Sequence, residues 1–355
     1  MDYYHFVRNV LFALPAEPAH KCALWALSRG LVPKSRTITY DNRLGVVCAG
    51  MGFENPIGVA PGFDKNAEAF QVMYDQGFGC VEVGTVTPKP QAGNPKPRMF
   101  RLKEDRAVIN RLGFNNEGYE HIFGRIYAQD SGRTGMLGIN IGKNKDSEDA
   151  LEDYLFLLRE AYMLADYITI NISSPNTLGL RDLQQEQHFE AFIKAIMQER
   201  NLLATFEKVR RPVWVKVAPD MEDDALCRML DVMMLYQVDA VIISNTTIAR
   251  PPSLKSPHAA QIGGLSGAPL RDVAEEKVRV AFRHMRGAMP IIGVGGIMDG
   301  ADAVARMRAG ATLIQLYSGL VYRGFALVEE IKEALVREVE RLGVESVADL
   351  VGLDA

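Results

Sequence analysis

The segment 171–177 holds the side chains that are best suited to chemistry in this chain. It comprises two asparagines, two serines, a proline and a threonine, and it follows an apolar run, 167–170, that is typical of a buried strand. Each asparagine amide offers two donors and one acceptor to a planar polar ligand. A serine in a loop stiffened by proline is a candidate base or nucleophile. Taken alone, the segment also fits a polar turn that only ends a strand.

Eight short apolar segments alternate with longer amphipathic segments from Pro56 onward. The expected strands are 56–60, 80–85, 137–141, 167–172, 213–217, 240–244, 290–293 and 313–316, and the expected helices are 67–76, 119–127, 151–165, 189–209, 222–236, 270–285, 300–309 and 325–342. Near-continuous apolar runs are typical of parallel strands that are buried on both faces. The alternation predicts an α/β fold, a TIM-type (β/α)8 barrel over residues 37–342. A doubly wound open sheet is the alternative, but no G-x-G-x-x-G motif follows the first strand.

Three further segments are expected outside this repeat. A hairpin that pairs 37–40 with 46–48 precedes the barrel. About 30 residues rich in Pro, Gly and Asn lie between Thr85 and Tyr119, and a loop of that length is usually a lid or a binding loop. Residues 343–355 form a C-terminal tail to which the sequence assigns no role.

Polar residues and glycines follow the expected strands, where a barrel has its active-site face. They lie in the segments 60–66, 84–87, 110–116, 140–144, 244–247, 293–296 and 317–319. The last two are glycine-containing turns after the seventh and eighth strands, the usual position of a phosphate site in such barrels. Glycines within 263–267 would add further backbone donors. Simple tight turns are the alternative for each glycine cluster.

Lys216 lies inside the apolar run 213–217, and a lysine within a buried strand is costly unless its charge is used. The ammonium suits a ligand that becomes anionic, and a flavin fits because its reduction leaves negative charge on the ring. A lysine that reaches solvent from the strand end is the alternative. Schiff-base chemistry at Lys216 or Lys65 is another.

Composition excludes several classes of protein. The chain has 355 residues, of which 48% are hydrophobic and 24% charged, as in soluble globular proteins. A net charge of −4 argues against nucleic acid as a partner. The 4 cysteines lie far apart without a CxxC pair, so neither a disulfide framework nor a metal site is expected. None of the 6 histidines directly follows an expected strand, which argues against a histidine-based triad.

Residues 1–36 differ from the rest of the chain in charge. They hold five Lys or Arg against two acidic residues, a local charge of +3. Phe6, Val10 and Leu14 recur at helical spacing, and a second helical segment follows near Pro18. Two short basic amphipathic helices predict attachment to a membrane surface, and without a targeting peptide we expect the cytoplasmic face of the inner membrane. A helical hairpin packed on its own barrel is the alternative.

These motifs together resemble the class 2 dihydroorotate dehydrogenases, the membrane-associated, quinone-reducing FMN enzymes of pyrimidine synthesis. The matching motifs, in the family's order, are PGFDK at 61–65, NRLGFNN at 110–116, NIGKN at 140–144, NISSPNT at 171–177, KVAPD at 216–220, SNTT at 244–247, GGLSG at 263–267, IGVGGI at 292–297 and YSG at 317–319. The resemblance implies oxidation of (S)-dihydroorotate to orotate in UMP biosynthesis. FMN would be the hydride acceptor and a membrane quinone the final electron acceptor.

The resemblance also implies roles for single residues. FMN would bind at Pro61, Gly62, Phe63, Asp64, Lys65, Thr85, Asn140, Asn171, Lys216, Ser244, Gly267, Gly296, Tyr317 and Ser318. Dihydroorotate would bind at Lys65, Asn110, Arg111, Leu112, Gly113, Phe114, Asn171, Asn176, Asn245 and Thr246. Ser174 would remove the C5 proton as hydride leaves C6, with Thr177 and a water beside Phe114 as its relay. Quinone would enter through residues 1–36, past His20, Arg101 and Tyr317.

Other families remain as alternatives on the sequence. Class 1 members use a cysteine as the base, and no cysteine lies in 171–177. Ser244 stands where the class 2 pattern has threonine, and the serine retains the hydroxyl group of that threonine. A different FMN barrel would show a histidine base after a late strand, as in a hydroxyacid oxidase, or a cysteine acid and a basic surface, as in a dihydrouridine synthase. A non-catalytic barrel that binds a phosphorylated ligand is a further alternative.

Overall fold

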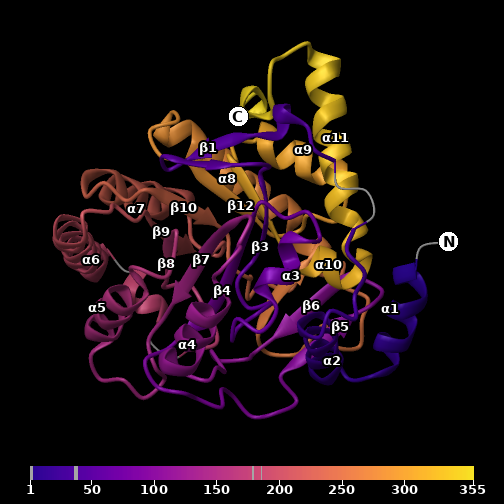
Figure 1. Ribbon diagram of the computed structural model, residues 1–355, viewed down its shortest axis with the longest axis horizontal. Helices are drawn as coiled ribbons and strands as arrows, with labels where there is room; N and C mark the ends of the chain where they lie inside the picture. The colour runs from indigo at the N-terminus through magenta and orange to yellow at the C-terminus, as the bar shows by residue number, and fades with distance from the viewer. Residues whose placement is uncertain (1–2, 36–38, 178–179, 185) are drawn as a thin grey trace.

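A closed barrel of parallel strands forms the centre of the computed structural model, which describes residues 3–35, 39–177, 180–184 and 186–355 (Figure 1). The barrel order is β10-β12-β13-β3-β4-β7-β8-β9. These strands are β3 Ile57–Val59, β4 Cys80–Val86, β7 Met136–Ile141, β8 Tyr167–Asn171, β9 Val213–Val217, β10 Ala240–Ile243, β12 Ile291–Val294 and β13 Leu313–Leu316. The predicted barrel is confirmed, and each strand lies within two residues of its expected bounds.

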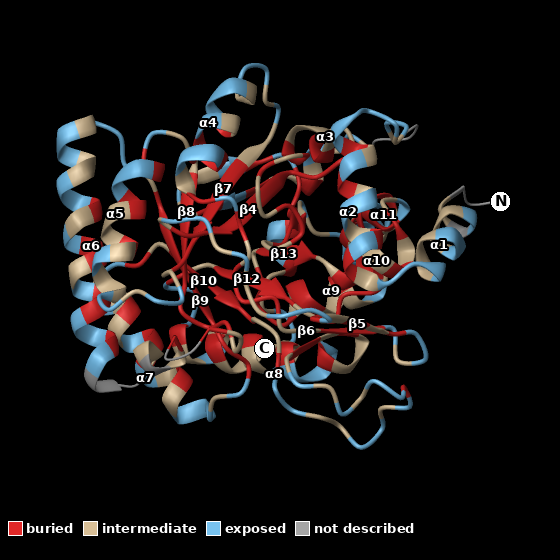
Figure 2. Ribbon diagram, turned by 90° about the horizontal axis from the view of Figure 1, so that it is seen from below, coloured by how far each residue is buried: buried red, intermediate tan, exposed pale blue. Residues whose placement is uncertain are grey.

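Helices follow the strands and cover the outside of the barrel. They are α3 Phe70–Tyr74, α4 Tyr119–Gln129, α5 Ala150–Ala161, α6 Glu186–Glu207, α7 Asp223–Leu235, α8 Arg271–Met285, α9 Gly300–Arg308, α10 Ser318–Arg323 and α11 Ala326–Leu342. In α11, Leu327, Ile331 and Leu335 recur every four residues and are buried, because helical residues at that spacing share one face. Figure 2 shows this pattern, with buried barrel strands inside helices that keep an exposed face.

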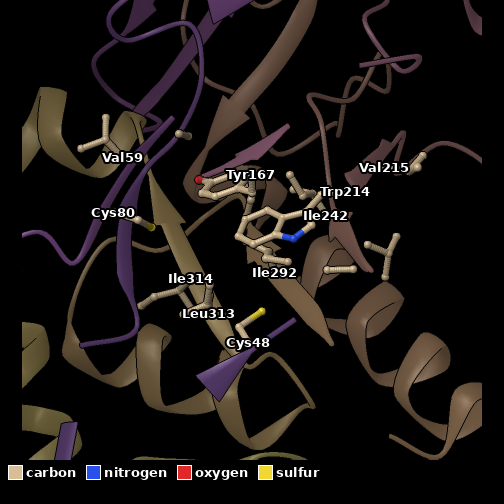
Figure 3. Packing of buried hydrophobic residues seen from close by; sticks show 14 of the residues in the cluster. Cys48, Val59, Cys80, Tyr167, Trp214, Val215, Ile242, Ile292, Leu313 and Ile314 are labelled. Carbon is tan, nitrogen blue, oxygen red and sulfur yellow. The ribbon is translucent and has the colours of Figure 1, made fainter. Parts of the chain in front are cut away.

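Two aromatic rings fill the amino-terminal end of the barrel interior. Tyr167 begins β8 and stacks on Trp214 of β9, with ring centroids 3.6 Å apart (Figure 3). Gly138 makes room for this pair, since a Cβ there would lie 2.2 Å from the Tyr167 ring. The packed rings close one end, so the open space of the barrel lies toward the carboxyl ends of its strands.

The hairpin ahead of the barrel differs from the expected one. Strand β1, Val46–Cys48, pairs with β2, Met51–Phe53, and not with residues 37–40. Of that predicted partner, 37–38 lie outside the described residues, and 39–40 are not in a strand. The register is set by a two-residue turn in which Ala49 and Gly50 both have positive φ, 52° and 78°, as tight hairpins require.

The long insertion after β4 contains a second sheet. Strands β5, Met99–Leu102, and β6, Ala107–Asn110, pair antiparallel with each other, and β6 also pairs with β11, Gly264–Gly267. The tight-turn alternative for 263–267 is therefore wrong, because most of the segment forms β11. Its glycines are needed for close strand pairing, since a Cβ at Gly263 would lie 2.3 Å from the Asn110 carbonyl oxygen.

The two-helix N-terminal extension is confirmed as α1, Tyr3–Ala13, and α2, Ala16–Ser28. Helix α1 packs beside α10, and α2 packs beside β5 (Figure 1). Glu17 of α2 forms an ion pair of 2.7 Å with the buried Arg98. On the other face, Phe6, Val10 and Leu14 are 73%, 57% and 42% exposed. The extension is therefore packed on the barrel through one face and leaves an apolar stripe on the other.

The chain after α11 packs back onto the barrel. A 3₁₀ helix, η4 Val347–Leu350, buries its first and last side chains, and Asp354 forms an ion pair of 2.7 Å with Arg308 of α9. Across the described part of the chain, no helix combines the length and the apolar character needed to cross a bilayer.

Candidate active site

A cavity opens at the carboxyl ends of the barrel strands, with an empty volume of about 1010 Å³ that includes its open mouth. Nineteen of the predicted site residues line it: Pro61, Gly62, Lys65, Thr85, Asn110, Leu112, Gly113, Phe114, Asn171, Ser174, Asn176, Lys216, Ser244, Asn245, Thr246, Gly267, Gly296, Tyr317 and Ser318. Its lining combines apolar side chains with a few convergent polar groups, as ligand sites commonly do. The second sheet contributes to the wall through residues of β5, β6 and β11.

Backbone atoms form one end of the cavity. Gly295 and Gly296 follow β12 with φ of 111° and 78°, conformations that glycine adopts without strain. A Cβ at Gly296 would lie 2.2 Å from the Arg271 Cα, so the turn packs directly on the start of α8. Across from it, the Ser318 and Ser266 hydroxyls are 2.9 Å apart. This backbone-lined end has the character of a phosphate site.

Lys216 reaches the cavity from β9 and is only 5% exposed. Burial lowers the pKa of its ammonium to about 8, while the carboxylate of Glu82 acts in the opposite direction. Among the described residues, its ammonium has neither a hydrogen bond nor an ion pair within 4.0 Å. The alternative of a lysine that reaches solvent is therefore wrong. A buried, unpaired cation facing a cavity suits a ligand that carries or gains negative charge.

A network of amides and hydroxyls forms the floor beside Lys216. The Asn171 side-chain amide donates to the Thr85 hydroxyl at 3.0 Å and to the Asn140 side-chain oxygen Oδ1 at 3.2 Å. The Asn245 amide donates to the Ser173 hydroxyl at 2.9 Å. Asn140 itself does not line the cavity; it orients Asn171 from behind. These bonds fix which edge of each amide faces a ligand.

Ser174 lies in the loop after β8 and is 6% exposed. Its hydroxyl accepts a hydrogen bond of 3.3 Å from the Asn176 backbone N–H. The Asn176 side chain in turn donates to the Asn110 side-chain oxygen at 3.3 Å, which ties this loop to the end of β6. The Thr177 hydroxyl is buried and has no partner among the described residues. The loop thus presents a serine and several amides in one wall of the cavity.

The 110–114 segment supplies a further part of the wall, except for Arg111. The Arg111 guanidinium turns outward and donates to the Gln261 side-chain oxygen at 3.1 Å and to the Ile262 carbonyl at 3.0 Å. Phe114 has a φ of 51°, an uncommon value for a phenylalanine. Two amide side chains hold it there, because Gln91 and Asn116 both donate to its carbonyl oxygen.

The predicted residues in the loop after β3 have two roles: some line the cavity, and Asp64 holds the loop in place. Lys65 lines the cavity, and burial together with the charge of Arg98 lowers the pKa of its ammonium to about 8. Phe63 and Asp64 do not line the cavity. The Asp64 carboxylate instead accepts hydrogen bonds from the backbone N–H groups of Glu68 and Ala69, at 2.8 and 2.7 Å. It holds the loop that presents Lys65.

A second cavity adjoins the first on the side of α2. The two share Gly62, Lys65, Met99 and Leu112 in their linings. His20 lines the second cavity, and burial lowers the pKa of its imidazole to about 4, so the ring is neutral. The ring is stacked with Tyr317, with centroids 6.3 Å apart. Arg101 lines neither cavity; its guanidinium lies over the Phe12 ring of α1 at 4.6 Å.

Glu82 was not among the predicted site residues. It is fully buried in β4, accepts hydrogen bonds from Asn140 at 2.8 Å and Gln315 at 2.7 Å, and acts on Lys216 electrostatically. Burial raises the pKa of its carboxyl, and the charge of Lys216 lowers it. The signal for it was present in the sequence, because an acidic residue inside an apolar strand is as unusual as Lys216.

Comparison with known proteins identifies the family. The sequence pattern of the dihydroorotate dehydrogenase family matches residues 43–339. The chain belongs to this family. Two similar relatives, both named dihydroorotate dehydrogenase (quinone), are those of Novosphingobium aromaticivorans, 48% identical with 99% of each chain covered, and of Rhodospirillum rubrum, 48% identical with 99% of this chain and 95% of the relative covered.

Solved structures agree with this assignment to the dihydroorotate dehydrogenases. The Eimeria tenella enzyme in complex with ferulenol has a TM-score of 0.90 and 40% identity over 95% of each chain. Its ligand-free form has a TM-score of 0.89. The class 2 resemblance and the expected quinone-dependent, FMN-linked oxidation of dihydroorotate are confirmed at the level of the family. Another type of FMN barrel or a non-catalytic barrel is no longer needed to explain the sequence.

Proposed function

We propose that this chain oxidises dihydroorotate to orotate, with FMN as the hydride acceptor and a quinone as the final electron acceptor. The observation that carries the proposal is the placement of Ser174 and four asparagine side chains in one cavity with the buried, unpaired Lys216. This set suits a planar amide-containing substrate beside a cofactor that gains negative charge.

The residues of the cavity fit FMN. The backbone-lined end with Gly267, Gly296 and Ser318 would hold its phosphate, and Lys216 would lie at the ring edge that becomes anionic. When bound, FMN supplies a site that accepts hydride from C6 of the substrate. Lys216 contributes most to the reduced state, because its charge then has a partner within the low-dielectric cavity.

Dihydroorotate would be bound by side chains from four loops: Lys65 for its carboxylate, and Asn110, Asn171, Asn176 and Asn245 for its ring amides. Ser174 would accept the C5 proton. A serine is a weak base at its ordinary pKa, so it requires a partner that takes the proton onward. The unpaired Thr177 hydroxyl in the same loop is suited to join that relay through a water molecule.

Quinone would reach FMN through the second cavity. That cavity lies between α2 and the barrel, shares its lining with the first at Gly62 and Lys65, and contains His20. The exposed apolar stripe of Phe6, Val10 and Leu14 would rest on the membrane that contains the quinone. The membrane contact would lie at the cytoplasmic face of the inner membrane.

The test is dihydroorotate-dependent reduction of quinone by the FMN-loaded protein. We expect quinone to be reduced in equal amount to the orotate formed, and the same preparation to be inactive with lactate, a typical 2-hydroxy acid. Orotate formation without any loss of quinone, or no orotate at all from flavin-loaded protein, would contradict the proposal.

A further inference from the structure

A buried arginine lies directly behind the backbone-lined end of the cavity. Arg306 of α9 is 0% exposed. Its side chain passes beneath β12, where Gly293 makes room for it, since a Cβ there would lie 2.6 Å from the Arg306 Cγ. One terminal nitrogen donates to the Gly295 carbonyl oxygen at 2.9 Å and to the Arg271 carbonyl oxygen at 3.1 Å. Arg306 therefore joins the turn after β12 to the start of α8.

The guanidinium of Arg306 forms no ion pair with any residue that the structure describes. Among the described residues, no carboxylate lies within 4.0 Å of its guanidinium, and its Nε and Nη1 are buried without any hydrogen bond. Burial lowers the pKa of Arg306 to about 10, so it is still protonated at neutral pH. A buried cation that only ties two loops together is unfavourable compared with an apolar or amide side chain. Tying the two loops together therefore does not explain why this position carries a positive charge.

The bond to Gly295 has a geometric consequence for the cavity. In a trans peptide, the C=O and the following N–H point in opposite directions. The peptide between Gly295 and Gly296 is trans, and its carbonyl points to Arg306. Its N–H, on Gly296, therefore points away from Arg306, and Gly296 lines the cavity. Among the described residues, no acceptor is found for this N–H.

We propose that Arg306 is a positioning residue for the phosphate of the cofactor: it orients the Gly295–Gly296 peptide so that its N–H faces the phosphate, and it places a buried positive charge behind that peptide. This inference rests on the proposed function, because it concerns how the same cavity holds FMN. Glu275 and Asp302 act on the guanidinium only from beyond ion-pair distance, so the phosphate dianion would add a further negative charge, and the low-dielectric surroundings keep that attraction strong. Arg306 acts through the peptide and does not touch the ligand.

Riboflavin provides the decisive comparison, since it has the ring of FMN without the phosphate. We would remove flavin from the holoenzyme, confirm by reloading that the protein is intact, and measure the Kd of FMN and of riboflavin for wild type and Arg306→Met. We expect FMN binding to weaken by about tenfold or more, with riboflavin binding unchanged. Arg306→Lys, which retains the charge, should restore most of the loss.

Arg308→Met is the matched control, because Arg308 lies on the same helix but pairs with Glu338 and Asp354. It should leave both dissociation constants unchanged. If Arg306→Met fails to fold, Arg306→Gln, which keeps a donor for the Gly295 carbonyl, gives the same comparison. Equal weakening of FMN and riboflavin binding would assign Arg306 a purely structural role and overturn the proposal, as would unchanged FMN binding. Neither result depends on whether dihydroorotate is the substrate.

Discussion

Ser174 depends on its surroundings for any basicity. It is nearly buried, it lies beside Asn176, and an unpaired threonine hydroxyl lies in the same loop. If Ser174 is the base as proposed, this burial favours a proton acceptor within the same loop over bulk water.

Replacing Ser174 by alanine tests that role. We expect Ser174→Ala to retain FMN and orotate, because neither depends on this hydroxyl, while the rate of flavin reduction by dihydroorotate falls about 10²–10⁴-fold. The measurement is single-turnover flavin reduction alongside orotate titration. A rate within a few-fold of wild type would remove Ser174 from the proton-transfer step, and lost orotate affinity would instead indicate a collapsed loop.

Lys65 predicts a pH dependence of substrate binding. Its pKa is lowered to about 8, so the ammonium is charged below that pH and neutral above it. Orotate is an anion, and its Kd should therefore be flat below about pH 8 and rise toward roughly tenfold per pH unit above it. Isothermal titration between about pH 7 and pH 9 gives the profile. Lys65→Met is the control: it should bind weakly at every pH. A flat wild-type profile would contradict the role of Lys65.

Single residues were predictable from sequence to an uneven degree. Lys216 stood out because a charge interrupts an apolar strand, and its burial follows from that position. Glu82 carried the same signal in β4 and was overlooked. Arg111 was assigned to the substrate with its neighbours, but its long side chain turns to Gln261, a contact that depends on two segments far apart in sequence. The direction in which a long side chain points depends on tertiary packing, so it cannot be predicted from the motif that contains the residue.

At the scale of elements, an ion pair attaches α2 to the second sheet. Arg98 contacts both oxygens of the Glu17 carboxylate, at 2.7 and 3.1 Å, and also donates to the Ala92 and Asn94 carbonyls. The two side chains are 6% and 11% exposed. Through this pair, the helix that borders the second cavity is joined to the loop leading into β5.

Glu17→Gln should therefore loosen the extension. The substitution leaves a nearly buried guanidinium without its countercharge, a change that costs about 3 kcal/mol or more in comparable pairs. Urea unfolding measures the loss, and limited proteolysis should show earlier cleavage between α2 and the barrel. Glu333→Gln breaks an exposed pair with Arg337 on α11 and should cost less than about 1 kcal/mol. Equal stability of the two variants would mean that the ion pair does not hold α2.

Elements were predicted best where the pattern repeats. The barrel strands and most helices follow from apolar runs and helical spacing, which depend on local sequence. The predicted hairpin was wrong and β11 was not predicted, for a shared reason: the pairing of each strand depends on residues outside its own segment. Ala49 and Gly50 form a turn through positive φ, and Gly264 pairs with Asn110 from a distant segment. Glycine-rich strands carry little local signal, since glycine is more often found in turns.

For the whole molecule, the N-terminal extension has features of both predicted arrangements, a helical hairpin packed on the barrel and a membrane-surface anchor. One face packs on the barrel, as a helical hairpin would, and the other leaves Phe6, Val10 and Leu14 exposed. An exposed apolar stripe on a short helix next to a basic segment favours a membrane surface. The second cavity lies next to α2, so docking of this side would bring its opening close to the lipid.

Phe6→Asp should weaken vesicle binding. Removing one phenylalanine that is buried in the membrane should lower the membrane partition coefficient roughly tenfold, and the added charge of the aspartate should lower it further. Co-sedimentation with vesicles that contain anionic lipid measures it. Phe206→Asp is the control, because Phe206 of α6 is even more exposed, 82% against 73%, and lies away from the extension. If both variants lose binding equally, or neither does, the stripe on α1 is not the membrane contact.

The most direct test of the central claim is anaerobic mixing of the FMN-loaded protein with dihydroorotate, followed by addition of quinone. We predict that dihydroorotate removes the absorbance of oxidised flavin in one turnover, that one orotate is formed per flavin, and that quinone then restores the absorbance. Flavin that dithionite reduces but dihydroorotate does not would contradict the account, even if the protein binds FMN and orotate.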